Sequence, residues 1–153
     1  MDNAKFTKQQ IEELKKLCGE SGIKLTHQRL EIFKELMAVS NHPSAELIYK
    51  RLRRKLPTVA LDTVYRTLAT FDELGLVKKL HLMNERTLFD TNLKVHHHFI
   101  CNHCRKVEDI YWQRFDSCKL PEGIGEVGMI ESRHLEFHGV CRNCLNIGRK
   151  DKQ

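Results

Sequence analysis

The chain has 153 residues, enough for one ordinary domain or for two small ones. Its 41% hydrophobic and 30% charged content is typical of a water-soluble globular protein. No apolar run approaches the roughly 20 residues of a membrane-spanning helix, and the N-terminus lacks the apolar core of a secretory signal. We therefore expect a cytoplasmic protein with no membrane partner. The formal net charge of +6 is compatible with nucleic-acid binding but does not establish it.

Four amphipathic segments within residues 1–93 predict a helical N-terminal domain. The first two carry apolar residues at helical spacing, around Leu14 and around Phe33. Ser44 is placed to cap a third helix. We expect that helix to turn three apolar side chains inward: Leu47, Ile48 and Leu52. The fourth begins near Leu61 and stops at Gly75, a residue that commonly follows the last turn of a helix.

Two short strand-like runs follow, residues 76–82 and 86–90, with the turn-prone Met83–Asn84–Glu85 between them. Helices followed by a small hairpin are the order of a winged helix-turn-helix, a DNA-binding fold. Opposite its apolar stripe, the fourth helix presents groups that contact phosphates and base edges; these are Thr63, Tyr65, Arg66 and Thr67. The third helix ends in a basic run, residues 50–55. The alternative, two solvated faces with no DNA role, is disfavoured by the surrounding order of helices.

Residues 94–153 predict a second, strand-rich domain. Residues 97–101 and 106–112 are typical of strands around a turn, and residues 128–141 alternate like a third strand. We expect a short helix from Phe115 to Leu120 and a frayed tail over residues 148–153. The predicted fold class is therefore α+β, with a winged helix-turn-helix domain (1–93) followed by a small α/β domain (94–153).

Four of the six cysteines form two Cys-x-x-Cys pairs, Cys101 with Cys104 and Cys141 with Cys144. Thiols of a cytosolic protein stay reduced, so pairs at this spacing indicate metal ligands and not disulfides. Zinc binds four thiolates in a closed tetrahedral shell, which stabilises structure and leaves no position for catalysis. The alternative is two unrelated reduced pairs, which the matching spacing disfavours.

A second set of candidate ligands is rich in nitrogen and oxygen: His42, Asp90, His96, His98 and Asp109. On a strand, His96 and His98 point to the same side because side chains alternate. Imidazoles and carboxylates suit Fe(II), Mn(II) or Zn(II) better than a metal that prefers thiolates. One ion bound by all five residues would connect the two predicted domains.

Five segments together resemble the ferric uptake regulator (Fur) family of metalloregulators; they are residues 22–29, 41–49, 62–77, 96–104 and 134–144. The resemblance implies a homodimer that binds double-stranded operator DNA and represses transcription when a regulatory metal is loaded. It implies no enzymatic activity. It also implies that Cys101, Cys104, Cys141 and Cys144 hold structural Zn(II), and that the five nitrogen and oxygen donors bind the regulatory metal.

Within that family, peroxide-sensing members carry Asp at the positions of Asp90 and Asp109, where iron-sensing members tend to carry Glu. The resemblance therefore favours a peroxide-responsive repressor. It implies that Fe(II) reacts with peroxide and that His42 or His96 is oxidised, whereas Mn(II) lacks this chemistry. An iron-responsive repressor is the alternative within the family.

A further metal site of many relatives would use His97, Asp116 and His134, although Val95 replaces an expected histidine. Two functions outside the family remain. Two histidines and one carboxylate also resemble the metal site of non-haem Fe(II) enzymes, but the chain is too short for their barrel. The second alternative function is a protein-interaction module that zinc stabilises and that does not bind DNA.

Overall fold

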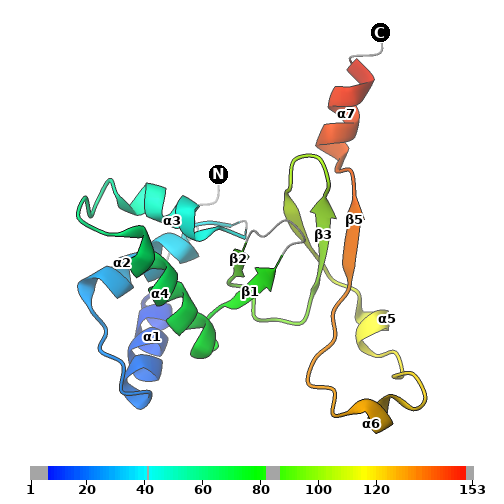
Figure 1. Ribbon diagram of the computed structural model, residues 1–153, viewed down its shortest axis with the longest axis horizontal. Helices are drawn as coiled ribbons and strands as arrows, with labels where there is room; N and C mark the ends of the chain where they lie inside the picture. The colour runs from blue at the N-terminus through cyan, green and yellow to red at the C-terminus, as the bar shows by residue number, and fades with distance from the viewer. Residues whose placement is uncertain (1–6, 41, 82–86, 151–153) are drawn as a thin grey trace. The chain divides into compact units, whose positions relative to one another are not determined.

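The computed structural model describes residues 7–40, 42–81 and 87–150. The chain divides into two compact units, Met1–Leu93 and Lys94–Gln153, which we call unit 1 and unit 2 (Figure 1). No helix in the described ranges is long and apolar enough to cross a membrane.

Unit 1 begins with four helices: α1 (Lys8–Glu20), α2 (His27–Met37), α3 (Ala45–Leu52) and α4 (Leu61–Glu73). A hydroxyl side chain caps each of the first three, because the first backbone N–H groups of a helix have no partner inside it. The hydroxyl oxygens of Thr7, Thr26 and Ser44 accept from the third residue of α1, α2 and α3.

The core of unit 1 lies between these helices and includes Leu14, Ile32, Leu36, Ile48, Leu52, Leu68 and Phe71. The rings of Phe33 and Phe71 meet edge to face, with centroids 5.5 Å apart. The prediction that Leu47 points inward was wrong, since this residue is 42% exposed. Ile48 and Leu52 lie four residues apart on the buried stripe of α3, and Leu47 lies outside it.

A two-stranded antiparallel hairpin follows α4. Gly75 adopts φ 69° after the last turn, and the N–H of Leu76 then donates to the carbonyl of Phe71 over 2.9 Å. Strand β1 (Lys78–His81) pairs with β2 (Thr87–Asp90), with Lys78 opposite Asp90. The expected turn at 83–85 lies outside the described residues.

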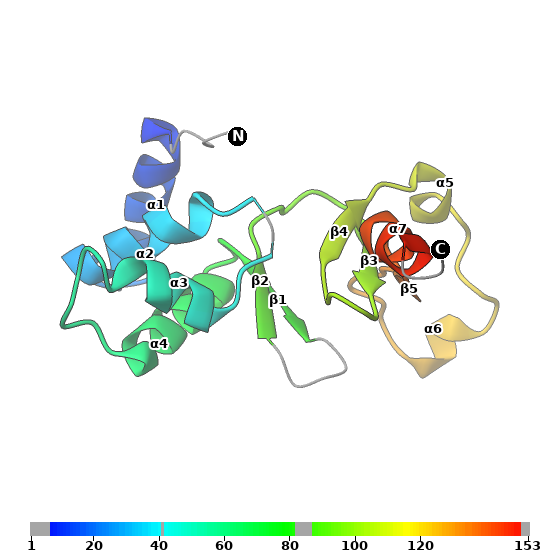
Figure 2. The ribbon, with the colours of Figure 1, turned by 90° about the horizontal axis from the view of Figure 1, so that it is seen from above.

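Unit 2 contains a three-stranded sheet of order β4-β3-β5. The central strand β3 (His97–Cys101) is antiparallel to β4 (Val107–Ile110) and parallel to β5 (Glu136–Gly139). Two short helices, α5 (Gln113–Asp116) and α6 (Ile124–Val127), lie in the connection between β4 and β5 (Figures 1 and 2). Helix α7 (Arg142–Lys150) follows β5.

Three local expectations for unit 2 were wrong. The helix predicted for residues 115–120 is α5, which begins at Gln113 and ends at Asp116. The strand predicted for residues 128–141 is shortened to β5, because only its last part pairs with β3. Residues 148–150, expected in a frayed tail, belong to α7.

Candidate metal centres

The four paired cysteines converge in unit 2, with their sulfur atoms within 4.8 Å of one another. The Sγ–Sγ distance is 3.9 Å from Cys101 to Cys144 and 3.7 Å from Cys104 to Cys141. A disulfide is only about 2 Å long, so these are separate thiols. A ZnS₄ tetrahedron with bonds of about 2.3 Å has edges of about 3.8 Å, and the cluster therefore fits zinc.

Backbone geometry brings the two cysteine pairs together. Cys101 ends β3, and its carbonyl accepts from the N–H of Arg105 over 3.0 Å, which closes the turn that carries Cys104. Arg105 adopts φ 62°, an uncommon conformation for a residue with a Cβ. The N–H of Asn102 donates to the carbonyl of Gly139 over 2.7 Å and so ties this turn to the end of β5, next to the second pair.

Two cysteines of the cluster, Cys101 and Cys144, have pKa values shifted in opposite directions. The N–H of Cys141 donates to Cys101 Sγ over 3.3 Å. This bond, with the backbone N–H groups of Cys104 and His103, lowers the pKa of Cys101 to about 6. Contact with the Cys141 sulfur, burial and the other sulfurs raise the pKa of Cys144 to about 12. Thiols held this close together repel one another once they are ionised. A bound cation removes this repulsion and takes the place of their protons.

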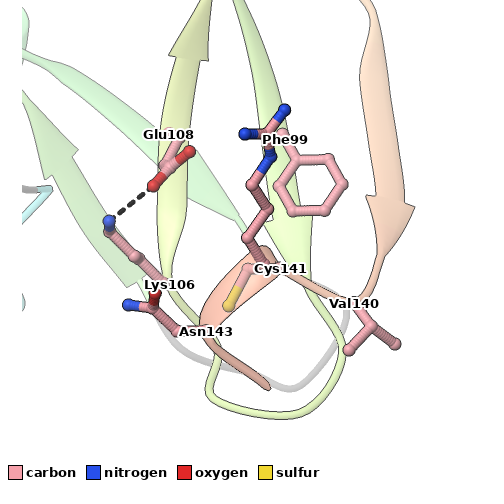
Figure 3. A pocket seen from close by; sticks show the side chains of 7 residues that line it. Phe99, Lys106, Glu108, Val140, Cys141 and Asn143 are labelled. Atoms are coloured by element: carbon pink, nitrogen blue, oxygen red, sulfur yellow. Dashed lines mark hydrogen bonds and ion pairs between the residues drawn. The ribbon is translucent and has the colours of Figure 1, made fainter. Parts of the chain in front are cut away.

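A hollow of about 490 Å³ lies beside this cluster (Figure 3). It is lined by Phe99, Lys106, Glu108, Val140, Cys141, Arg142 and Asn143. Lys106 and Glu108 form an ion pair at its edge, which raises the pKa of Lys106. Since Cys141 lines the hollow, one sulfur of the cluster is reached from it.

Three of the predicted nitrogen and oxygen donors meet on one face of the sheet in unit 2. His98 on β3 is paired with Asp109 on β4, and His96 precedes β3. The Nε2 atoms of His96 and His98 are 3.0 Å apart, and His96 Nε2 lies 3.7 Å from Asp109 Oδ1. Ligands bound at about 2.1 Å to one ion are about 3 to 3.5 Å apart, so these atoms fit a shared metal.

The backbone orients the first of these imidazoles. His96 Nδ1 lies 2.7 Å from the carbonyl of Lys94, which fixes the ring and leaves Nε2 toward His98. Both imidazoles are buried, at 8% and 5% exposure. Burial of ionisable groups in one place is typical of a metal site, because each would otherwise lose its hydration without compensation.

The other two predicted donors lie together in unit 1. His42 precedes the cap of α3, and Asp90 ends β2. Their side chains are 8% and 4% exposed, with His42 Nε2 3.7 Å from Asp90 Oδ1. Unit 1 thus presents one imidazole and one carboxylate at a distance suitable for joint ligation.

The further metal site is assembled only in part. His97 is fully buried, and its Nδ1 accepts from the N–H of Leu135 over 3.2 Å. Its Nε2 faces Asp116 Oδ1 at 3.2 Å, and among the described residues both atoms are buried without a hydrogen bond. His134 does not join them: its Nε2 faces Glu136 Oε1 at 3.9 Å. Of the predicted three-residue set, the structure therefore places His97 and Asp116 side by side, and among the described residues His134 is not grouped with them.

The predicted DNA-binding residues lie on α4, and three of the four are accessible. Tyr65 is 41% exposed, Arg66 is exposed and Thr63 is half-buried. The expectation that Thr67 lies on the exposed face of this helix was wrong, because it is only 4% exposed. It lies three residues after Val64 and four before Phe71, which places it on the packed stripe of the helix.

Comparison with known proteins assigns the chain to a family. The ferric uptake regulator family matches residues 20–120, more than half of the sequence. The chain belongs to this family. The peroxide-responsive repressor PerR of Staphylococcus epidermidis is 31% identical over 140 residues, which cover 91% of this chain and 93% of that protein. The peroxide operon regulator of Bacillus subtilis is 34% identical over 135 residues, covering 88% and 93%.

A solved structure of the same family confirms the fold class. The ferric uptake regulator of Pseudomonas aeruginosa with manganese superposes with a TM-score of 0.66 at 26% identity, over 82% of this chain and 95% of that one. The α+β class, with a winged helix-turn-helix followed by an α/β unit, is therefore the architecture of this family member.

Two carboxylates of unit 1 have partners that sequence reasoning did not identify. The Tyr65 hydroxyl donates a hydrogen bond to Glu46 on α3, and this bond raises the pKa of Tyr65. Buried Glu35 on α2 accepts from Arg51 Nε over 2.8 Å and from Lys55 Nζ over 2.6 Å. Part of the basic run thus contacts a carboxylate of its own unit. Sequence spacing signals neither pair, since their members lie on different helices.

Proposed function

We propose that this Fur-family protein is a metal-dependent transcriptional repressor that releases operator DNA in response to peroxide. The convergence of His96, His98 and Asp109 on one sheet face is the observation that carries the proposal. Imidazole nitrogen and carboxylate oxygen bind Fe(II) and Mn(II), whereas the separate four-sulfur cluster suits zinc. The names of the Staphylococcus and Bacillus relatives support the peroxide response.

The two metal centres have different roles in this proposal. Zn(II) bound by Cys101, Cys104, Cys141 and Cys144 joins β3 to the segment after β5 and stabilises unit 2. The regulatory ion takes His96, His98 and Asp109 from unit 2, and His42 and Asp90 from unit 1. Each group is preassembled within its own unit, which supports this assignment. An ion held by these residues would set the state of unit 1 that binds DNA.

The peroxide response follows from the ligands. Bound Fe(II) supplies the electrons that activate hydrogen peroxide. Overall, peroxide inserts one oxygen atom into a C–H bond of His42 or His96, the second oxygen leaves as water, and the imidazole loses two electrons. The modified ring would be a poorer ligand for the ion. Mn(II) does not supply this reaction, and repression persists with it.

DNA binding is assigned to the exposed face of α4, through Tyr65, Arg66 and Thr63. A guanidinium reads guanine edges or contacts phosphate, and an aromatic ring packs on thymine methyl groups. The operator is double-stranded, and two copies of the chain bind it as a homodimer. The manganese-containing relative supports use of a divalent ion.

The test compares Fe(II)- and Mn(II)-loaded protein. Selection from a randomised duplex library with Mn(II)-loaded protein supplies an operator, and fluorescence anisotropy measures binding to it. We expect metal-dependent binding with both ions, and release after a brief peroxide pulse with Fe(II) alone. Mass spectrometry should place a gain of about 16 Da, one oxygen atom, on His42 or His96.

Three results would contradict parts of the proposal. Equal oxidation of exposed His103 and of His96 would show that the bound ion does not direct the reaction. Release by removal of Fe(II) with no oxidation at any histidine would identify an iron-responsive repressor instead. Sedimentation of the zinc-loaded protein as a single chain at operator-binding concentrations would exclude the homodimer.

A further inference from the structure

A chain of contacts within unit 1 leads from the two metal-ligand candidates of that unit to Tyr65. Its first part is the attachment of α3 to β2. The N–H of Phe89 donates to the carbonyl of Pro43 over 2.9 Å, and Ser44 forms an isolated antiparallel bridge with Leu88. His42 and Asp90 lie immediately beside these contacts, one on each segment.

The segment after His42 is held rigidly. Pro43 is fully buried and its ring fixes φ, and Ala45 is fully buried as well. Between them, Ser44 caps α3 by accepting from the N–H of Leu47 over 3.3 Å. A change in the position of His42 or Asp90 therefore moves the first turn of α3 as a body, because no flexible residue separates them.

The second part of the chain of contacts links that first turn to the DNA-binding face. Glu46 lies in the first turn of α3, and it accepts a hydrogen bond from the Tyr65 hydroxyl on α4. Helices α3 and α4 pack against each other. A hydrogen bond to a carboxylate is stronger and more directional than one to a neutral group, so it constrains where the Tyr65 ring lies.

We propose that Glu46 is a positioning residue that couples the metal ligands of unit 1 to the DNA-reading Tyr65. The inference rests on the proposed function and adds a route for its regulation. Because the Tyr65 hydroxyl donates its hydrogen bond to Glu46, it offers DNA its ring and an oxygen lone pair in a fixed place. The position of that ring then depends on where His42 and Asp90 hold the start of α3.

The chain offers a matched control for Glu46. Asp62 is also an exposed carboxylate in the first turn of its helix, and its Oδ2 lies 2.8 Å from Nε of a DNA-binding candidate, Arg66. Removal of either carboxylate has the same effect on net charge and on the helix dipole. The ion pair of Asp62 with Arg66 lies within one helix, so it does not link α4 to α3 or β2.

The experiment measures operator affinity with and without Mn(II) by anisotropy, and the ratio of the two dissociation constants is the coupling. Glu46→Ala and Tyr65→Phe should each reduce this ratio about tenfold, the effect of one charge-assisted hydrogen bond. The double variant should reduce it no further, because both changes break the same link. Asp62→Ala should shift both affinities and leave the ratio unchanged.

A second readout separates coupling from general damage. Coupling is reciprocal, so the increase in Mn(II) affinity caused by saturating operator should fall by the same factor in Glu46→Ala. Its Mn(II) affinity without DNA should stay that of wild type. Wild-type coupling in Glu46→Ala, or an equal loss in Asp62→Ala, would overturn the inference. Metal-independent binding by the wild-type protein would instead reject the proposed function itself.

Discussion

Replacing both Arg51 and Lys55 with methionine should destabilise unit 1 by about 3 kcal/mol at neutral pH. Glu35 is only 6% exposed, whereas the side chains of Arg51 and Lys55 are 46% and 57% exposed. Removing both cations leaves a buried carboxylate without a counter-charge, which costs about 3 to 5 kcal/mol. Protonation limits that cost, since neutralising a carboxylate at pH 7 takes roughly 3.7 kcal/mol.

Removing the carboxylate instead of the two cations should destabilise unit 1 much less. Glu35→Gln leaves two largely solvated cations, which water stabilises. In the background without Arg51 and Lys55, Glu35→Gln should recover most of the lost stability because it removes the buried charge. This recovery distinguishes an electrostatic cause from a loss of the packing made by the two long side chains.

The same cluster predicts the pH dependence. Burial alone raises the pKa of Glu35, but hydrogen bonds and charges from Lys55 and Arg51 outweigh it and lower the pKa below its ordinary value. A lowered carboxyl pKa adds stability that is present above the unfolded pKa and is lost as the pH falls through the folded value. The difference between wild type and double variant should therefore be largest near neutrality and shrink steadily as the pH falls toward about 4, where neutralising the carboxylate costs little.

Thermal unfolding provides the assay, with a separate signal for each unit. Far-ultraviolet circular dichroism follows the long helices of unit 1, and the fluorescence of Trp112, the single tryptophan, follows unit 2. For a domain of this size, about 3 kcal/mol lowers the midpoint by roughly 10–20 °C. A loss below about 1 kcal/mol, or no recovery with Glu35→Gln, would refute the reasoning.

Three further predictions concern the metals and DNA. Cys141→Ser should lose zinc, measured by elemental analysis, and unfold unit 2 with it, because structural zinc contributes on the order of 10 kcal/mol; a zinc-free variant with native Trp112 fluorescence would contradict this. Asp109→Glu should lower the yield of oxidised histidine in Fe(II)-loaded protein, measured by peptide mass spectrometry, because the extra methylene displaces the carboxylate; an unchanged yield would remove Asp109 from the site. Arg54→Ala should reduce the salt dependence of operator binding by about one phosphate contact, whereas Arg51→Met, whose cation lies on Glu35, should change it less; equal slopes would contradict the distinction.

Regular features of unit 1 could be predicted from sequence. Helix α4 and its termination just before Gly75 follow from a long apolar period and a residue suited to positive φ. The cap formed by Ser44 could also be predicted, because capping depends only on neighbouring residues. In unit 2, the spacing of the two Cys-x-x-Cys pairs and the alternation of His96 and His98 gave most of the candidate ligands, because these patterns are also local.

Features that depend on packing between elements could not be read from the sequence. The link between Glu46 and Tyr65 exists because α3 and α4 pack against each other, and no local pattern encodes that packing. The buried position of Thr67 arises from the exact width of the packed stripe on α4. Helix α7 was missed because its sequence lacks the apolar repeat of a core helix, and its described side chains are mostly exposed.

The parallel pairing of β5 with β3 has a consequence for biosynthesis. His98 finds its β4 partner, Asp109, within the same hairpin, but its β5 partner, Glu136, is synthesised much later. At roughly 5–20 residues per second, unit 1 has seconds to fold on the ribosome before that strand emerges. Until then, β3 has one open edge and zinc has only the first cysteine pair. A nascent chain can thus complete the fold of unit 1 before the sheet and the four-cysteine cluster of unit 2 can be assembled.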